Sequence, residues 1–234
     1  MNRTDTLHAE WLNCFSRLHQ GEFFRMLGAG LLKLEHYKAF LRETYHNASH
    51  NPKKMALFMA HLDSDQPSLE AKFLRHAAME IGHGELALED LRIIGGDADT
   101  ARNSRPLPTT EALTAFIVFQ IQHRNPLAYL GYLYHLEAMP AHMGASSMAP
   151  LLSMGVPASA TSFLREHAEA DPVHVKWNRE YLEGFIGSDE DMEAVLYGMR
   201  GTCELHGIMF QGIMDQCRGP QEWIAMPAAE KTAP

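Results

Sequence analysis

A glutamate and a histidine with the spacing of metal ligands, Glu80 and His83, lie in the segment HAAMEIGHGELALEDL. Residues three apart share one face of an α-helix, and this face is otherwise mostly apolar, with Phe73, Ala77 and Leu91 along it. Carboxylate-bridged di-iron bundles use the spacing E-x-x-H to bring both side chains to one metal pair. Taken alone, the two residues are equally well interpreted as a hydrogen-bonded or solvated pair.

A lone carboxylate, Glu137, interrupts the apolar helical stripe around the segment HLEAMPAHMG. It is the only acidic residue between Glu111 and Glu166. Burying an unpaired carboxylate is costly, and a bound cation would remove that cost. The alternative is a glutamate at the edge of the stripe that reaches solvent.

The segment HAEADPVH places His167, Asp171 and His174 at positions i, i+4 and i+7. On one continuous helix these three side chains stack on the same face over two turns. Two imidazoles and a carboxylate suit iron, manganese or zinc better than calcium. Pro172 leaves a second interpretation open, in which Asp171 only caps a helix that begins at the proline.

Together the three motifs offer three carboxylates and three imidazoles. Such a set can fill much of the coordination of two metal ions and still leave positions open. A single zinc ion would use only three or four of the six side chains. The motifs therefore favour a di-iron centre, whose open positions would bind dioxygen.

Several other residues are secondary candidates. Glu43, His46 and His50 form a further ligand-like stripe in FLRETYHNASHNP; they are alternative ligands, residues that orient a ligating imidazole, or a partly exposed polar helix end. His206 lies on an apolar stripe and is either a hydrogen-bonded core histidine or a substrate contact. Two arginines near apolar stripes, Arg124 and Arg200, could hold a substrate carboxylate. The alternative is that both are surface residues.

Apolar residues recur at helical spacing along almost the whole chain, and strand-like alternation is hard to find. Glycine and proline clusters divide the periodic segments. The sequence thus predicts an all-α protein with helices near residues 5–19, 33–50, 54–62, 68–94, 110–123, 126–146, 159–186 (with a bend at the proline) and 189–216.

The length of 234 residues and the hydrophobic content of 46% are sufficient for one sizeable core. No segment between the glycine and proline breaks carries enough helices to form a core alone. We therefore predict one helical domain over residues 1–222 and a flexible tail over residues 223–234.

The formal net charge of −9 argues against a nucleic-acid partner, because such proteins normally carry a basic excess. No apolar run reaches the roughly eighteen residues of a membrane-spanning helix, so no membrane association is expected. The three cysteines, Cys14, Cys203 and Cys217, have no C-x-x-C spacing. Their odd number and the absence of an apolar leader favour a reducing cytoplasm.

The ordered motifs resemble those of the haem-oxygenase-like di-iron oxidases and oxygenases, which share a seven-helix fold with haem oxygenase and thiaminase II. The motifs are E-I-G-H followed by LEDLRIIGG, then Y-H-L-E, then H-A-E-A-D-P-V-H, over residues 80–174. The resemblance implies a single seven-helix haem-oxygenase-like bundle. It also implies a metal-ligand set, which consists of Glu80, His83, Glu137, His167, Asp171 and His174.

The resemblance further implies an enzyme that holds two Fe(2+) ions per chain and uses O2 as co-substrate. Its substrate would be a small metabolite, with an amino acid favoured and N-oxygenation, desaturation or oxidative C–C cleavage as the reaction. A fatty-acid oxidative decarboxylase is an alternative within the same family. A homodimer and an external electron donor are also expected from the family.

Three rival functions share related folds. A metal-free relative of thiaminase II or pyrroloquinoline-quinone synthase is one; thiaminase II needs a nucleophilic cysteine in its central helix, and residues 126–146 contain none. Cys203 lies on the last helix and is expected to be a small buried residue. Haem oxygenase needs a proximal histidine on its first helix and a glycine-rich distal helix, and His8 and the segment LGAGLL resemble these features only weakly. A ferritin-like iron store is disfavoured because the three motifs are unequal, although the spacing E-x-x-H itself occurs at Glu43–His46 and at Glu80–His83.

Overall fold

The structure is a computed structural model, and it describes residues 2–219, apart from the side chains of residues 145 and 147. Within this part of the chain the regular secondary structure is helical, so the all-α prediction is confirmed. The predicted tail at residues 223–234 lies outside the described residues. The α-helices are α1 (Arg3–His19), α2 (Glu22–Gly28), α3 (Leu34–Ala48), α4 (Asn51–His61), α5 (Pro67–Met79), α6 (His83–Ile93), α7 (Ala98–Asn103), α8 (Pro108–His123), α9 (Ala128–Met143), α10 (Met148–Ser153), α11 (Ser162–Phe185) and α12 (Asp189–Gln216).

The number of helices exceeds the seven that were expected. Three of the additional segments, α2, α7 and α10, are short helices within stretches that were predicted to be loops or the end of a longer helix. In addition, the helix expected over residues 68–94 is two helices, α5 and α6. The backbone at Gly82 has φ of +96°, a conformation that glycine adopts without steric cost, and it ends one helix before the next begins.

Helix α9 forms the centre of the bundle, with α11, α12 and α8 packed around it. Ten of its sixteen residues are buried. It approaches α12 most closely at two glycines, Gly131 and Gly198, where an added Cβ would overlap the backbone of the partner helix. These two positions let the two helices pack backbone to backbone.

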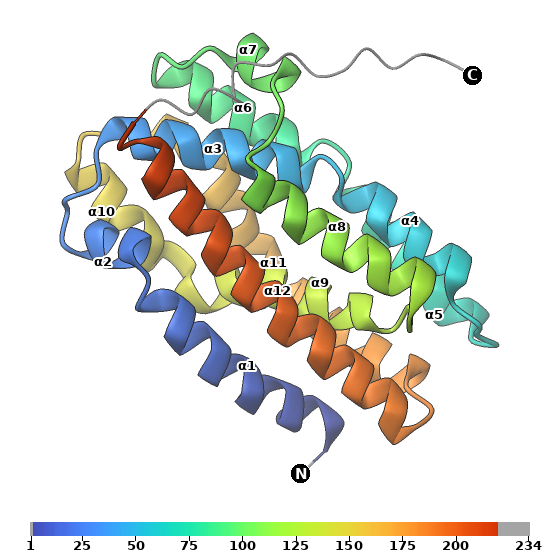
Figure 1. The fold of residues 1–234 in the computed structure, drawn as a ribbon. Coiled ribbons are helices and arrows are strands. Elements are labelled where there is room, and N and C mark those ends of the chain that lie inside the picture. The colour runs from blue at the N-terminus through green and yellow to red at the C-terminus, as the bar shows by residue number, and fades with distance from the viewer. Residues whose placement is uncertain (1, 220–234) are drawn as a thin grey trace.

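Helix α12 is the longest element and runs diagonally across the bundle (Figure 1). Helix α1 packs along one side of it, and α8 and α3 pack along the other. Its first turn has the capping box that its sequence predicts, with Ser188 and Asp191 bonding reciprocally. No described helix combines the length and the apolar composition that a membrane-spanning segment requires.

The start of α11 is held by α6. Asp90 on α6 is fully buried and accepts hydrogen bonds from the backbone N–H groups of Ser162 and Phe163, at 2.9 Å each. A carboxylate at this position satisfies free N–H groups at the helix N-terminus and stabilises the helix dipole. Further along, α11 continues through Pro172, so Asp171 lies inside a helix and is not an N-cap.

Candidate metal centre

Four helices bring ligand-type side chains together inside the bundle. Helix α5 supplies His76 and ends at Glu80, and α6 begins at His83. Helix α9 supplies Glu137. Helix α11 supplies the three residues of the HAEADPVH motif.

Two overlapping groups of donor atoms are close enough to share a metal ion. One group contains His76, Glu80 and His174; the other contains Glu80, His83 and His167. Within each group the three donor atoms all lie within 4.8 Å of one another. Glu80 is common to both groups, so its carboxylate is placed to contact two ions.

The shortest donor-to-donor distance in the cluster, between His76 and Glu137, matches that of two ligands of one ion, and the other distances are somewhat longer. The Glu80 Oε1 atom lies 3.5 Å from His83 Nδ1, 3.9 Å from His174 Nδ1 and 4.0 Å from His76 Nε2. His76 Nε2 also lies 3.1 Å from Glu137 Oε1. Two ligands at about 2.1 Å from one ion are about 3.0–3.4 Å apart for octahedral to tetrahedral angles.

Many of these donor atoms are buried and have no hydrogen-bond partner among the described residues. Buried polar atoms are normally paired, and an unpaired buried charge is strongly unfavourable. Cations bound between these side chains would compensate the unpaired atoms. The unpaired atoms of the cluster are His76 Nε2, His83 Nδ1, Glu137 Oε1, Asp171 Oδ1 and Oδ2, and His174 Nδ1.

Glu137 and Asp171 each contact one member of the two groups. Asp171 Oδ1 lies 3.3 Å from His174 Nδ1, and Glu137 contacts His76 as described above. On its other side, Glu137 Oε2 accepts a hydrogen bond from the amide of Asn178, which is fully buried on α11. This bond leaves Glu137 Oε1 directed at the cluster.

Other buried groups orient Glu80 and His167. The Asn51 amide donates to Glu80 Oε2 at 3.2 Å, and the Tyr129 hydroxyl donates to the Asn51 carbonyl oxygen at 3.0 Å. His167 Nδ1 lies 2.7 Å from the Phe163 carbonyl oxygen. A carbonyl oxygen can only accept, so Nδ1 carries the proton and Nε2 is free to bind a metal.

The protonation states of the cluster follow from burial and from neighbouring charges. Burial raises the pKa of Glu137 well above its usual value, and the nearby Asp171 carboxylate adds to this. Burial also raises the pKa of Asp171 and lowers that of His76 to about 4. Burial would raise the pKa of Glu80 as well, but His83, His167 and the Asn51 amide together outweigh it and lower the pKa to about 2. The ionised form is thus favoured at Glu80 and disfavoured by burial at Glu137.

The secondary candidates on α3 do not join the cluster. Both carboxylate oxygens of Glu43 are occupied, by the Arg42 guanidinium and by the backbone N–H of Leu107. His46 Nε2 bonds the Ser104 hydroxyl at 3.1 Å. His50 is the N-cap residue of α4. Glu43 therefore ties α3 to the start of α8, and Glu43 and His46 are buried, unlike the partly exposed helix end that was considered from the sequence.

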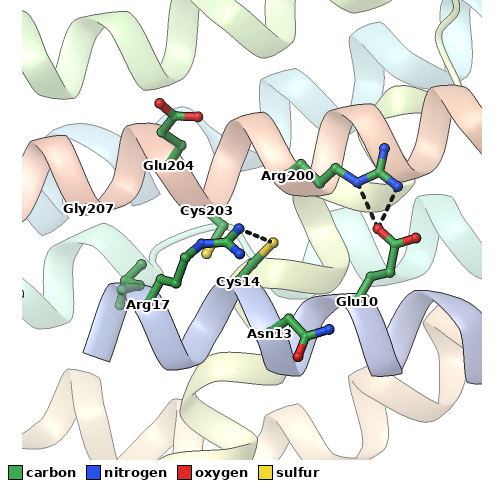
Figure 2. Close-up of a pocket in the computed structure, with 9 residues that line it drawn as sticks. Glu10, Asn13, Cys14, Arg17, Arg200, Cys203, Glu204 and Gly207 are labelled. Atoms are coloured by element: carbon green, nitrogen blue, oxygen red, sulfur yellow. Dashed lines mark hydrogen bonds and ion pairs between the residues drawn. The ribbon is translucent and has the colours of Figure 1, made fainter. Parts of the chain in front are cut away.

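A separate hollow of about 910 Å³ lies between α1 and α12 and contains none of the cluster residues (Figure 2). Arg200 lines it and pairs with Glu10, so this arginine holds surface helices together. Cys203 also lines it, with its pKa raised to about 12 by burial. Arg124 packs its guanidinium over the Phe119 ring, 5.7 Å from the centroid. Neither arginine lines the cavity at the cluster.

A cavity of about 100 Å³ borders the cluster. Glu80, Glu137, His167 and Asp171 lie in its wall, and His206 does as well. The rest of the wall is mainly apolar and comes from α3, α9, α11 and α12. A small organic molecule in this cavity would lie directly against the proposed ligands.

Two residues of the cluster, His76 and Asn178, were not singled out from the sequence. Helical spacing could have indicated both residues, because residues four apart lie on the same helix face. His76 is four residues before Glu80, and Asn178 is four residues after His174. Whether such a residue reaches the cluster depends on how the helices are rotated against each other, which spacing alone does not give.

The profile of a protein family described as iron-containing redox enzymes matches residues 38–207. The match covers most of the chain and all of the cluster residues, and the protein belongs to this family. The chain has no match among curated proteins.

Solved structures show the same fold. A domain of unknown function with a haem-oxygenase-like fold from Shewanella denitrificans is 24% identical, with a TM-score of 0.82 over 93% of this chain and 94% of that one. A TenA homologue from Pseudomonas syringae is 12% identical, with a TM-score of 0.76 over 90% and 92%. A TenA homologue from P. horikoshii is 15% identical, with a TM-score of 0.69 over 91% and 100%. The fold is therefore haem-oxygenase-like, as the resemblance implied.

Proposed function

We propose that this protein is a non-haem di-iron oxidase or oxygenase that uses O2 to oxidise a small metabolite, with an amino acid as the favoured substrate. The observation that carries the proposal is the pair of donor groups that share Glu80. One metal ion cannot use all seven of the converging side chains, whereas two ions bridged by Glu80 can. Membership of an iron-containing redox family supports iron as the metal.

When bound, two ferrous ions would supply electrons and open coordination positions for O2. The chain's own residues hold the site in shape. Asn178 orients Glu137, and the Asn51–Tyr129 pair orients Glu80. Since the surrounding wall is mainly apolar, water is largely excluded, which strengthens electrostatic interactions at the site.

Anaerobic titration with Fe(2+) tests the metal centre. We expect two ions per chain in the wild type and loss of both in Glu80→Ala, because that carboxylate belongs to both donor groups. Glu43→Ala is the matched control, since it removes a buried carboxylate whose oxygens are bonded elsewhere. A wild-type stoichiometry near zero would refute the proposal.

Stopped-flow absorbance after mixing the ferrous protein with O2 tests the chemistry. We expect an iron-dependent transient, and faster O2 consumption with one class in a panel of amino acids and fatty acids. If no panel member changes O2 consumption, the substrate assignment is contradicted.

An external electron donor, a homodimer and a cytoplasmic location are part of the same proposal. Light scattering checks the dimer.

A metal-free thiaminase-like enzyme is the second candidate, and the similarity to two TenA homologues supports it at the level of the fold. Such an enzyme needs a cysteine thiol at its cavity. Cys14 and Cys203 line the hollow between α1 and α12, and Cys217 lines a groove at the end of α12. None of the three lines the cavity at the cluster, so the metal-dependent function is favoured.

A further inference from the structure

A chain of hydrogen bonds leads from the bundle core to the cavity at the cluster. The Trp11 indole Nε1 donates to His135 Nδ1 at 3.2 Å, and His135 Nε2 lies 3.0 Å from His206 Nδ1. Trp11 and His135 are fully buried, and His206 is 5% exposed. The three side chains come from α1, α9 and α12, so the chain crosses three helices.

The position of each proton along this chain follows by elimination. An indole nitrogen is only a donor, so His135 Nδ1 accepts and is unprotonated. An imidazole carries at least one proton, which places it on His135 Nε2, and this atom donates to His206 Nδ1. His206 Nδ1 is therefore unprotonated too, and His206 carries its proton on Nε2.

The low basicity of both rings agrees with this assignment. Burial lowers the pKa of His135 well below its usual value and lowers that of His206 to about 4. Both imidazoles are thus neutral near pH 7, with one proton each. A buried tryptophan in this way fixes which nitrogen of a distant histidine is a donor.

His206 lies in the wall of the cavity at the cluster. No described residue forms a hydrogen bond with its Nε2 atom, in contrast to its Nδ1 atom. Its ring stacks on Phe210, with 4.7 Å between centroids. The ring is therefore held on one edge by His135 and on one face by Phe210, which leaves the Nε2–H group for a bound molecule.

A second, apolar cavity of about 60 Å³ adjoins the cavity at the cluster. The two share four wall residues, namely Phe40, Met139, Pro140 and Leu164. Phe23, Phe24 and Phe210 also line the second cavity, and no charged side chain does. A molecule with a polar head at the cluster would thus have space for a short apolar tail.

We propose that the Nε2–H group of His206 donates a hydrogen bond to a carboxylate or carbonyl oxygen of the substrate, whose short apolar tail occupies the second cavity. This proposal rests on the proposed function in that it takes the cavity at the cluster as the substrate site. It makes His206 a residue that selects for an acceptor head group, and Trp11 a positioning residue that acts through His135.

Calorimetric titration of the zinc-loaded full-length protein tests the contact without turnover. The probes are hexanoate and norleucine, which share a carboxylate and a four-carbon tail beyond Cα or C2, and hexylamine, which has a donor head. We expect His206→Phe to weaken carboxylate binding about tenfold or more, since hydrogen bonds to charged groups are strong. We expect His206→Gln, which retains an N–H group, to weaken it less. His61→Phe, at an exposed position of α4 that lines neither cavity, should leave it unchanged.

Hexanoate and norleucine distinguish the two sources of the head group, a fatty acid and an amino acid; the tighter binder identifies the class. Wild-type protein is expected to favour both over hexylamine. Equal carboxylate affinity in wild type and His206→Phe would overturn the proposal, as would failure of both carboxylates to bind the zinc-loaded wild type.

The nitrogen NMR shifts of ring-labelled histidine give a second, independent readout. We expect a protonated Nε2 and a bare Nδ1 for His206 in the wild type. In Trp11→Phe, His135 loses the donor that fixes its tautomer, and we expect a shift of His206 toward the Nδ1–H form together with weaker hexanoate binding. An Nδ1–H tautomer in the wild type would refute the proposal. Because the metal-free protein suffices for this measurement, a failed metal centre and a failed His206 assignment are distinguishable.

Discussion

Replacing Asn178 by leucine is expected to weaken metal binding while leaving the fold intact. In the structure the Asn178 amide donates to Glu137 Oε2 and leaves Oε1 directed at the cluster. The residue is fully buried, so leucine retains most of the packing and removes the amide, whose Oδ1 atom has no hydrogen-bond partner among the described residues. The variant therefore isolates the orientation of one candidate ligand.

Two independent estimates give the size of the effect. Residues that orient a metal ligand typically contribute 10- to 100-fold in metal affinity. A hydrogen bond to a charged group contributes about 1.5–3 kcal/mol, which corresponds to about 10- to 150-fold. Loss of the Asn178 hydrogen bond further disfavours the ionised form of Glu137, which binds a cation. Burial already disfavours this form, as the raised pKa of Glu137 shows. We therefore expect a loss of about 10- to 100-fold.

Anaerobic competition between the protein and a chelator for Fe(2+) measures this change. Asn125→Leu is the matched control, because the Asn125 amide also donates to a carboxylate, that of Asp191 at 3.2 Å, away from the cluster. Thermal unfolding of both metal-free variants shows whether each one folds. Unchanged iron affinity in a folded Asn178→Leu protein would refute the role of this amide, and an equal loss in both variants would show that the effect is not specific.

Three further predictions follow from the structure. First, His76→Ala should reduce the Fe(2+) stoichiometry from two to one, because His76 belongs to only one donor group; anaerobic titration measures this, and an unchanged stoichiometry contradicts it. Second, Gly198→Ala should lower the free energy of unfolding by about 1–3 kcal/mol through overpacking against α9, whereas Gly207→Ala, with open space around it, should not; thermal unfolding compares the two. Third, iron affinity should rise with pH above the ordinary carboxylate range, with release of protons, because the raised pKa values of Glu137 and Asp171 mean that a cation must displace protons at lower pH; calorimetry in buffers of different ionisation enthalpy measures the release, and its absence would contradict the prediction.

The helical periodicity was sufficient to predict most of the long helices. The helices expected at residues 110–123 and 189–216 match α8 and α12 within two residues or fewer at each end. The break between α5 and α6 was missed because the apolar spacing continues across it. Only the backbone angle at Gly82 shows that the helix ends there, and glycine is compatible with both a helix interior and a left-handed turn.

For the candidate site, spacing identified candidate side chains but not what each helix face meets, and Glu80 and His83 do not share one helix face as predicted, since the break at Gly82 separates them. His167, Asp171 and His174 follow directly from helical geometry, and Pro172 does not interrupt the helix. Glu43 has the same residue type and a similar setting in the sequence as Glu80. Their different roles come from tertiary neighbours, since Arg42 and the backbone of α8 occupy the Glu43 carboxylate.

The break at Gly82 also explains how one carboxylate can serve two ions. His167 and His174 lie seven residues apart on α11, which corresponds to about 10 Å along the helix axis at 1.5 Å per residue. Each faces a different imidazole: the His174 ring centroid lies 4.2 Å from that of His76 at the end of α5, and the His167 ring centroid lies 4.9 Å from that of His83 at the start of α6. Glu80 lies at the junction between these two helices, so it is near both imidazole pairs. The left-handed glycine thus directs His83 along a new helix, and the two pairs of rings belong to two donor groups that share the Glu80 carboxylate.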